Sequence, residues 1–80
     1  MTTYYHLADM QNGGDLMEIG RNSESLEEIA EAILSYISID YPSENDGSQE
    51  WEDWQSIQKM GAEELAEWWE FSINTTTNKI

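Results

Sequence analysis

An amphipathic pattern marks the middle of the chain. Apolar side chains recur there at intervals of three and four residues, as on one side of an α-helix. Ser25 is followed three residues later by Glu28, which is the spacing of a capping box at the start of a helix. The pattern predicts an amphipathic helix over residues 25–38. The residues on its apolar side are Leu26, Ile29, Ala30, Ile33, Leu34 and Ile37.

The first twenty residues have the pattern of a β-hairpin. Residues 3–9 are rich in side chains that favour strands, and the turn that follows contains an Asn-Gly pair. Such a pair supplies the positive φ angles that a tight hairpin turn needs. We therefore expect strands over residues 3–9 and 16–20, joined by a turn over residues 10–15, as a hairpin within residues 1–20.

An acidic loop and two short helices are predicted next. Residues 40–50 contain proline, asparagine and glycine and no basic side chain, which is typical of a solvated loop. Apolar residues spaced by three then predict a helix over residues 49–60, ended by Gly61. A second helix is expected over residues 62–69, so that helices occupy most of residues 49–69.

The end of the chain changes from helical spacing to alternation. Phe71 and Ile73 lie on one side and polar residues on the other, which predicts a strand over residues 70–76 that completes a small antiparallel sheet with the hairpin. The tail over residues 75–80 is expected to fray. The predicted fold class is α+β, as a single small domain over residues 1–80.

The tryptophans divide between core and surface. Trp51, Trp54 and Trp69 are expected to supply much of the buried area of so short a chain. Trp68 and Trp69 are adjacent, so they cannot both face inward from one helix. We expect Trp69 to be buried and Trp68 to be partly exposed. Trp68 then either covers the edge of the core or serves as a contact for a basic partner.

The charge balance excludes several functions. The 80 residues contain 17 acidic and 3 basic side chains, for a net charge of −14. Nucleic acids and anionic membranes would be repelled by such a surface. No cysteine is present, so disulfides and cysteine chemistry are excluded. No apolar run approaches the roughly 18 residues of a membrane-spanning helix, and the N-terminus lacks the pattern of a signal peptide. The expected location is the cytoplasm.

Candidate chemistry in the sequence is weak. A calcium-binding loop aligned on Gly47 would place Pro42, which has no side-chain ligand, at the first ligand position. His6 is the only histidine and is expected to be an ordinary strand residue. Paired carboxylates act as catalysts only in a pocket that raises the pKa of one of them, which solvated helix faces do not provide. We predict no catalytic residue, no metal site and no cofactor, and hence no enzyme.

The acidic side chains follow the predicted elements in three rows. Carboxylates three and four residues apart on a helix lie about 5–6 Å from one another, and such like-charged neighbours are mildly destabilising. With three cations in the chain, ion pairing does not account for them. We expect these rows, together with Trp68, to contact a basic partner. The rows are Glu24, Glu27, Glu28 and Glu31; Asp40, Glu44, Asp46, Glu50, Glu52 and Asp53; and Glu63, Glu64, Glu67 and Glu70.

In size, acidity and layout the chain resembles the small phage-encoded DNA-mimic inhibitors. That group includes anti-CRISPR proteins, anti-restriction proteins and uracil-DNA glycosylase inhibitors. The resemblance covers the whole chain in type and has no alignable motif, so it assigns no individual residue. It implies a stoichiometric inhibitor, of the anti-CRISPR type first, that blocks the DNA- or PAM-binding groove of a CRISPR effector in the cytoplasm of the host cell.

Other interpretations of the acidity remain open at this point. The chain could inhibit a restriction enzyme or a uracil-DNA glycosylase, or it could be an adaptor that binds a basic protein. An ordinary domain adapted to high salt would also be acidic, and a small metal-binding or enzymatic domain is the least favoured reading. The sequence does not distinguish a monomer from a dimer.

Overall fold

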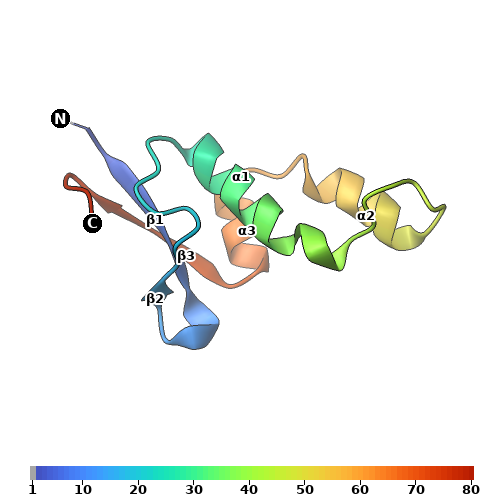
Figure 1. Ribbon diagram of the computed structural model, residues 1–80, viewed down its shortest axis with the longest axis horizontal. Helices are drawn as coiled ribbons and strands as arrows, with labels where there is room; N and C mark the ends of the chain where they lie inside the picture. The colour runs from blue at the N-terminus through green and yellow to red at the C-terminus, as the bar shows by residue number, and fades with distance from the viewer. Residues whose placement is uncertain (1) are drawn as a thin grey trace.

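The centre of the fold is strand β1 (Tyr4–Asp9), which pairs with a strand on each side. The computed structural model describes residues 2–80 and contains a three-stranded antiparallel sheet in the order β2-β1-β3 (Figure 1). The strand β3 (Phe71–Thr76) pairs with β1 along its whole length, with Tyr4 opposite Thr76 and Asp9 opposite Phe71. The two ends of the chain therefore form one structural unit, and the predicted α+β class is confirmed.

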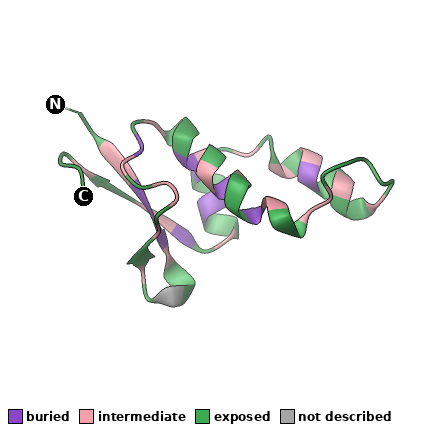
Figure 2. Cartoon of the chain, viewed as in Figure 1, coloured by how far each residue is buried: buried purple, intermediate pink, exposed green. Residues whose placement is uncertain are grey.

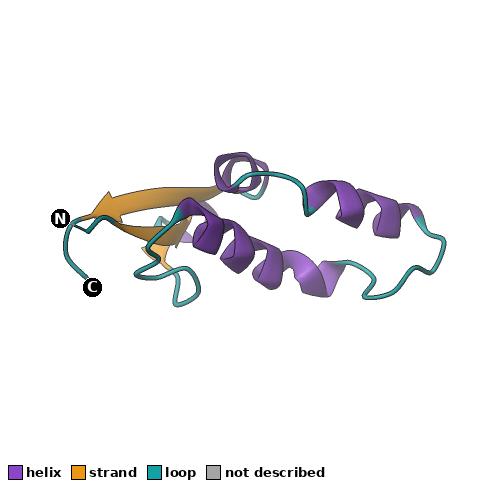
Figure 3. Ribbon diagram, turned by 90° about the horizontal axis from the view of Figure 1, so that it is seen from above, coloured by secondary structure: helices purple, strands orange, loops and turns teal. Residues whose placement is uncertain are grey.

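Three helices complete the molecule. They are α1 (Leu26–Ile37), α2 (Gln49–Ile57) and α3 (Ala62–Trp68). Helices α1 and α3 lie next to each other beside the sheet. Helix α2 extends the molecule beyond them, away from the strands (Figures 1 and 3). The result is an elongated body of 46 × 26 × 18 Å. No helix within residues 2–80 is long and apolar enough to cross a membrane.

The core lies where β1, α1 and α3 meet. Figure 2 shows the buried residues gathered in that region, with one more buried position in α2. Leu7, Ile29, Ile33 and Leu65 are completely excluded from solvent. Burial of apolar area of this kind is the main favourable contribution to folding. The other members of the core are Ile37, Trp54, Ala62, Ala66 and Phe71.

The predicted amphipathic helix is present with the predicted start. The side chain of Ser25 caps α1 and accepts a hydrogen bond from the backbone N–H of Glu28 at 3.2 Å. The carboxylate of Glu28 accepts from the backbone N–H of Glu24, one residue before the position that a regular capping box would use. Both interactions satisfy backbone donors near the start of the helix, which otherwise have no partner.

The predicted returning strand over residues 16–20 is wrong beyond its first residue. Strand β2 is only Asp15–Leu16, and the turn before it includes a short 3-10 helix, Met10–Asn12. The chain then follows β1 irregularly because Gly20 and Asn22 have φ angles of 76° and 56°, which no regular strand contains. Gly20 passes so close to β1 that a Cβ there would lie 3.0 Å from the Cβ of Leu7.

The C-terminal elements also differ from expectation in detail. Helix α2 ends at Ile57, and the chain tightens into a turn in which the Met60 N–H donates to the Ile57 carbonyl at 3.0 Å. Glu70 has a φ of 57° and forms the turn between α3 and β3, so it belongs to neither the helix nor the strand. The tail that was expected to fray is hydrogen-bonded at both ends, because residues 75 and 76 belong to β3 and Ile80 exchanges hydrogen bonds of 2.9 and 3.2 Å with the side chain of Asn22.

The tryptophans are placed largely as expected. Trp54 is 8% exposed and belongs to the core. Trp51 and Trp69 are half-buried, and Trp69 packs against the core, so the burial expected of Trp69 is only partial. Trp68 is 71% exposed, which makes it one of the most exposed large apolar side chains of the described residues.

Two isoleucines at opposite extremes of exposure test where the core lies. Ile33 is completely buried, and Ile39, in the short 3-10 helix Ser38–Asp40 that follows α1, is 87% exposed. Ile33→Val should lower the free energy of unfolding by about 0.5–1.5 kcal/mol, because it removes a packed methylene. Ile39→Val should change it by less than about 0.5 kcal/mol. Urea denaturation of both variants measures this, and equal effects would contradict the described core.

Candidate protein-interaction surface

The predicted acidic contact residues are all on the surface of the protein. None of their side chains is buried or half-buried. Trp68, the one aromatic residue among the predicted contacts, is exposed as well. The structure therefore presents every residue of the three rows, and Trp68, to solvent: Glu24, Glu27, Glu28, Glu31, Asp40, Glu44, Asp46, Glu50, Glu52, Asp53, Glu63, Glu64, Glu67, Trp68 and Glu70.

Parts of two predicted rows face each other across one groove. The groove has a volume of about 700 Å³ and runs between the first turns of α1 and the outer side of α3. Its acidic sides come from Glu27 on α1 and from Glu63, Glu64 and Glu67 on α3. Its apolar lining comes from Leu26, Ala30, Met60 and Ala62. The packing of α3 beside α1 thus brings to one groove carboxylates that are more than 30 residues apart in the sequence.

The remaining row is separate from this groove. Glu44 and Asp46 lie in the loop that precedes α2, and Glu50, Glu52 and Asp53 lie on α2 itself. Because α2 forms the far end of the elongated body, these carboxylates lie at the end opposite the sheet (Figures 1 and 3). The predicted surface is therefore divided between the acidic groove and a separate acidic end, and Glu24, Glu28, Glu31 and Glu70 belong to neither.

Several of the acidic residues also have a structural role. Asp46 accepts hydrogen bonds from the backbone and side chain of Ser48, the N-cap of α2, and these bonds lower the pKa of Asp46. Asp53 accepts from the Gln49 side chain at 3.0 Å. Glu70 accepts from the Gln11 side chain at 2.9 Å, across the turn that leads into β3. These hydrogen bonds were not predicted from the sequence, where only ion pairs between acidic and basic side chains were considered.

Helix polarity accounts for more of the acidic residues. The first turn of each α-helix carries two glutamates, where the positive end of the helix dipole favours negative charge. These residues are Glu27 and Glu28 on α1, Glu50 and Glu52 on α2, and Glu63 and Glu64 on α3. No basic residue lies in the last turn of any of these helices, where a cation would be favourable. These six glutamates are a minority of the 17 acidic residues, so helix stabilisation accounts for only part of the acidity.

An aromatic pocket at the junction of α2 and α3 was not predicted from the sequence. It has a volume of about 430 Å³ and is lined by Tyr41, Asp53, Ser56, Ile57, Met60, Trp68 and Trp69. The ring of Tyr41 stacks on Trp54, with 5.0 Å between centroids and 15° between planes. The residues come from three separate segments, and only Trp68 and Asp53 among them were predicted as contact residues, one as an exposed aromatic residue and the other as part of an acidic row.

The charges around this pocket affect Tyr41. Burial raises the pKa of the Tyr41 hydroxyl above its ordinary value of 10.0, and the negative charges of Asp53 and Asp40 raise it further. A carboxylate raises the pKa of a tyrosine because it disfavours a second negative charge nearby. The charges of Asp53 and Asp40 thus add to the effect of burial in disfavouring a negative charge on the Tyr41 hydroxyl.

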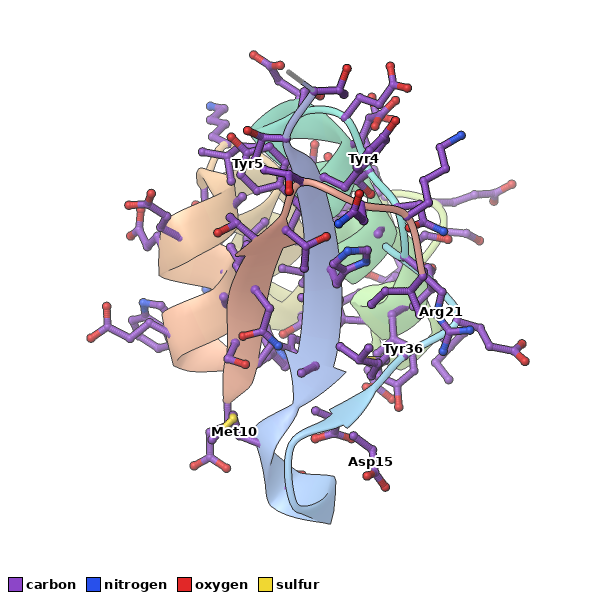
Figure 4. All side chains as sticks on the ribbon, turned by 90° about the vertical axis from the view of Figure 1, so that its left-hand side faces the viewer. Tyr4, Tyr5, Met10, Asp15, Arg21 and Tyr36 are labelled. Atoms are coloured by element: carbon purple, nitrogen blue, oxygen red, sulfur yellow. The ribbon has the colours of Figure 1, made fainter. Side chains whose placement is uncertain are left out.

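A third hollow lies between the hairpin and α1. Its volume is about 680 Å³, and it is lined by Asp9, Asp15, Glu18 and Tyr36 together with Leu16, Met17 and Ile19. Figure 4 shows Asp15 and Tyr36 on the same side of the sheet, with Met10 at the hairpin turn. Its three carboxylates were not among the predicted contacts, because they belong to no helical row.

His6 is part of the framework that joins the chain ends. It is 1% exposed, and its Nδ1 accepts a hydrogen bond from the Asn22 N–H at 3.1 Å. Its Nε2 lies 3.3 Å from the Thr76 hydroxyl oxygen. The ring therefore has a packing and hydrogen-bonding role. Within residues 2–80, no three histidine or carboxylate side chains are grouped as a metal ion would need.

The titration of Tyr41 tests the geometry of the aromatic pocket. Because its folded-state pKa is raised, the folded protein holds this proton more tightly than the unfolded chain. The raised pKa of Tyr41 thus favours the folded state. This contribution to the free energy of unfolding is fully present below about pH 10 and is lost as pH rises through the folded-state pKa. Asp53→Asn should lower the pKa of Tyr41 part of the way toward 10.0, as measured by NMR of ¹³C-labelled tyrosine rings.

Glu52→Gln is the matched control for that titration. Glu52 is on the same helix and exposed, but it does not line the pocket. Its replacement should leave the Tyr41 titration close to that of the wild-type protein. If Asp53→Asn and Glu52→Gln moved the titration equally, the effect would come from net charge and the described position of Asp53 beside Tyr41 would be wrong.

No protein-family model, curated protein or solved structure matches the chain. A functional conclusion therefore rests on the geometric features described above.

Proposed function

We propose that this protein is a DNA-mimic inhibitor that occupies the DNA-binding groove of a host protein. The observation that carries the proposal is the density of charge along an elongated body. Its 14 net negative charges over a length of 46 Å amount to one per about 3.3 Å. Duplex DNA carries roughly one charge per 3.4 Å of helix axis on each strand, or one per about 1.7 Å over both strands, so the protein has about half the linear charge density of the duplex. A groove that has evolved to bind a nucleic acid backbone would therefore also attract this protein.

The acidic groove between α1 and α3 is the proposed centre of contact. Carboxylates from both helices project along it, and its apolar lining is provided by small and flexible side chains. The aliphatic stems of lysine and arginine can pack on such a lining while their charged ends meet the carboxylates. Acidic and basic surfaces of this kind accelerate association through electrostatic steering.

A CRISPR effector is the first partner to test. The size, acidity and α+β layout of the chain resemble those of anti-CRISPR proteins, and the effector would be met in the cytoplasm of the host cell. A restriction enzyme and a uracil-DNA glycosylase belong in the same assay as alternative targets. An adaptor for a basic protein would bind without competing with DNA, so competition separates the two interpretations.

The decisive experiment measures displacement of labelled DNA from each candidate enzyme by fluorescence anisotropy. The protein should displace DNA at stoichiometric concentrations, and its apparent affinity should fall as the salt concentration rises, because screening weakens the attraction. If saturating protein left DNA binding by every enzyme in the panel unchanged, the DNA-mimic proposal would be wrong. Binding that leaves DNA in place would favour the adaptor.

A pair of charge-reversal variants locates the contact. Glu27→Lys, Glu64→Lys and Glu67→Lys together place three cations at the acidic groove. This variant should bind the target about 10- to 100-fold more weakly at low salt, mainly through slower association. Surface plasmon resonance at two salt concentrations separates the rate constants. Glu28 is left intact because it accepts a hydrogen bond at the start of α1.

The matched control reverses three charges at the other end of the molecule. Glu44→Lys, Glu50→Lys and Glu52→Lys change the net charge from −14 to −8, as the groove variant does, because each replacement adds two units. Each variant also alters two helix first-turn positions, so the effects on folding are comparable. If the control lost as much affinity as the groove variant, the contact would not be centred on the groove between α1 and α3.

A further inference from the structure

We propose that the aromatic pocket between α2 and α3 binds an arginine side chain of the partner protein. The pocket differs from the acidic groove because aromatic and apolar side chains form most of its lining, with Asp53 as its one carboxylate. It thus combines flat, apolar surfaces with a single negative charge. An arginine offers the complementary features, a planar cation on an aliphatic stem.

The aromatic side chains provide surfaces on which a guanidinium can stack. Trp68 is 71% exposed and Trp69 is half-buried, and both line the pocket. Tyr41 is held in place by its stacking on the buried Trp54. A cation over the face of a tryptophan or tyrosine is attracted by the quadrupole of the ring, most strongly for tryptophan. An exposed tryptophan beside a fixed aromatic wall is also a typical hot spot of protein interfaces.

The electrostatics of the pocket favour a cation. Asp53 lines the pocket, and its charge contributes to the raised pKa of the Tyr41 hydroxyl, after the larger effect of burial. A carboxylate has two oxygens and about four acceptor positions. The hydrogen bond from Gln49 uses one position on Oδ1, so the carboxylate can accept further donors. A positive group placed here would therefore meet the negative charge of Asp53 and an acceptor already oriented by a hydrogen bond within α2.

The chemistry of the lining selects arginine over lysine. The guanidinium is planar, stacks on aromatic rings and pairs with a carboxylate through two parallel hydrogen bonds. The ammonium group of lysine is compact and strongly hydrated, so it loses more on entering an apolar pocket. Ile57 and Met60 supply the apolar surface on which the arginine stem can lie.

The arginine pocket adds a specific contact to the proposed function. The identity of the partner protein rests on that proposed function. DNA-binding proteins commonly carry arginine at the surfaces that contact phosphates and bases. The acidic groove would attract such a protein from a distance, whereas the pocket would bind one of its side chains at short range. The pocket can be tested without the partner, so its failure is distinguishable from failure of the DNA-mimic proposal.

The test is a titration of the isolated protein with N-acetyl-arginine amide, followed by the NMR signal of the Trp68 indole N–H. We expect a saturable shift, with affinity at least about tenfold higher than for N-acetyl-citrulline amide, which has nearly the same shape without the charge. N-acetyl-lysine amide should bind more weakly than the arginine compound. Equal shifts with arginine and citrulline, or equal affinity for arginine and lysine, would overturn the assignment.

Variants identify the residues responsible. Asp53→Asn and Trp68→Leu should each reduce the affinity for N-acetyl-arginine amide several-fold, followed for Trp68→Leu through the ring signals of Tyr41. Glu52→Gln should leave it unchanged, because Glu52 is exposed on α2 and does not line the pocket. Circular dichroism confirms that each variant is folded. If Glu52→Gln weakened binding as much as Asp53→Asn, the arginine compound would be responding to net charge, and the pocket assignment would be wrong.

Discussion

The pairing of β1 with β3 is the constraint on which the rest of the structure depends. It joins Tyr4 to Thr76 and so makes the first and last strands neighbours in the sheet. Because α3 leads directly into β3 through Glu70, this pairing also fixes where α3 lies. Leu65 of α3 is then buried in the same cluster as Leu7 and the apolar side of α1. The acidic groove exists only because α1 and α3 are held together in this way.

The acidic surface has to combine two opposing requirements, a stable fold and a high negative charge. Net charge destabilises a compact state through self-repulsion, and a domain of this size has a free energy of unfolding of only a few kcal/mol. Part of the cost is offset locally, because glutamates occupy the first turn of each α-helix and Asp46 accepts hydrogen bonds at the cap of α2. Most of the remaining carboxylates are exposed, and the proposed inhibitor would use them as an imitation of a nucleic acid backbone.

The acidic groove and the aromatic pocket would contribute differently to binding. Exposed carboxylates act at long range and mainly affect the rate of association and its dependence on salt. An aromatic pocket acts at short range, excludes water and mainly affects the rate of dissociation. Met60 lines both, since it follows α2 and precedes α3. A partner that spans this junction could therefore use both features at once.

The sequence by itself determined the local features of this protein. The apolar spacing and Ser25 established α1, alternation around Phe71 predicted β3, and the lack of cations made an acidic surface unavoidable. These depend on neighbours within one or two turns, which periodicity records. Only the tertiary structure decided which carboxylates face one another and that Tyr41, Asp53 and Trp68 line one pocket. Such contacts depend on how helices pack and where strands pair, and no spacing within a single segment encodes that.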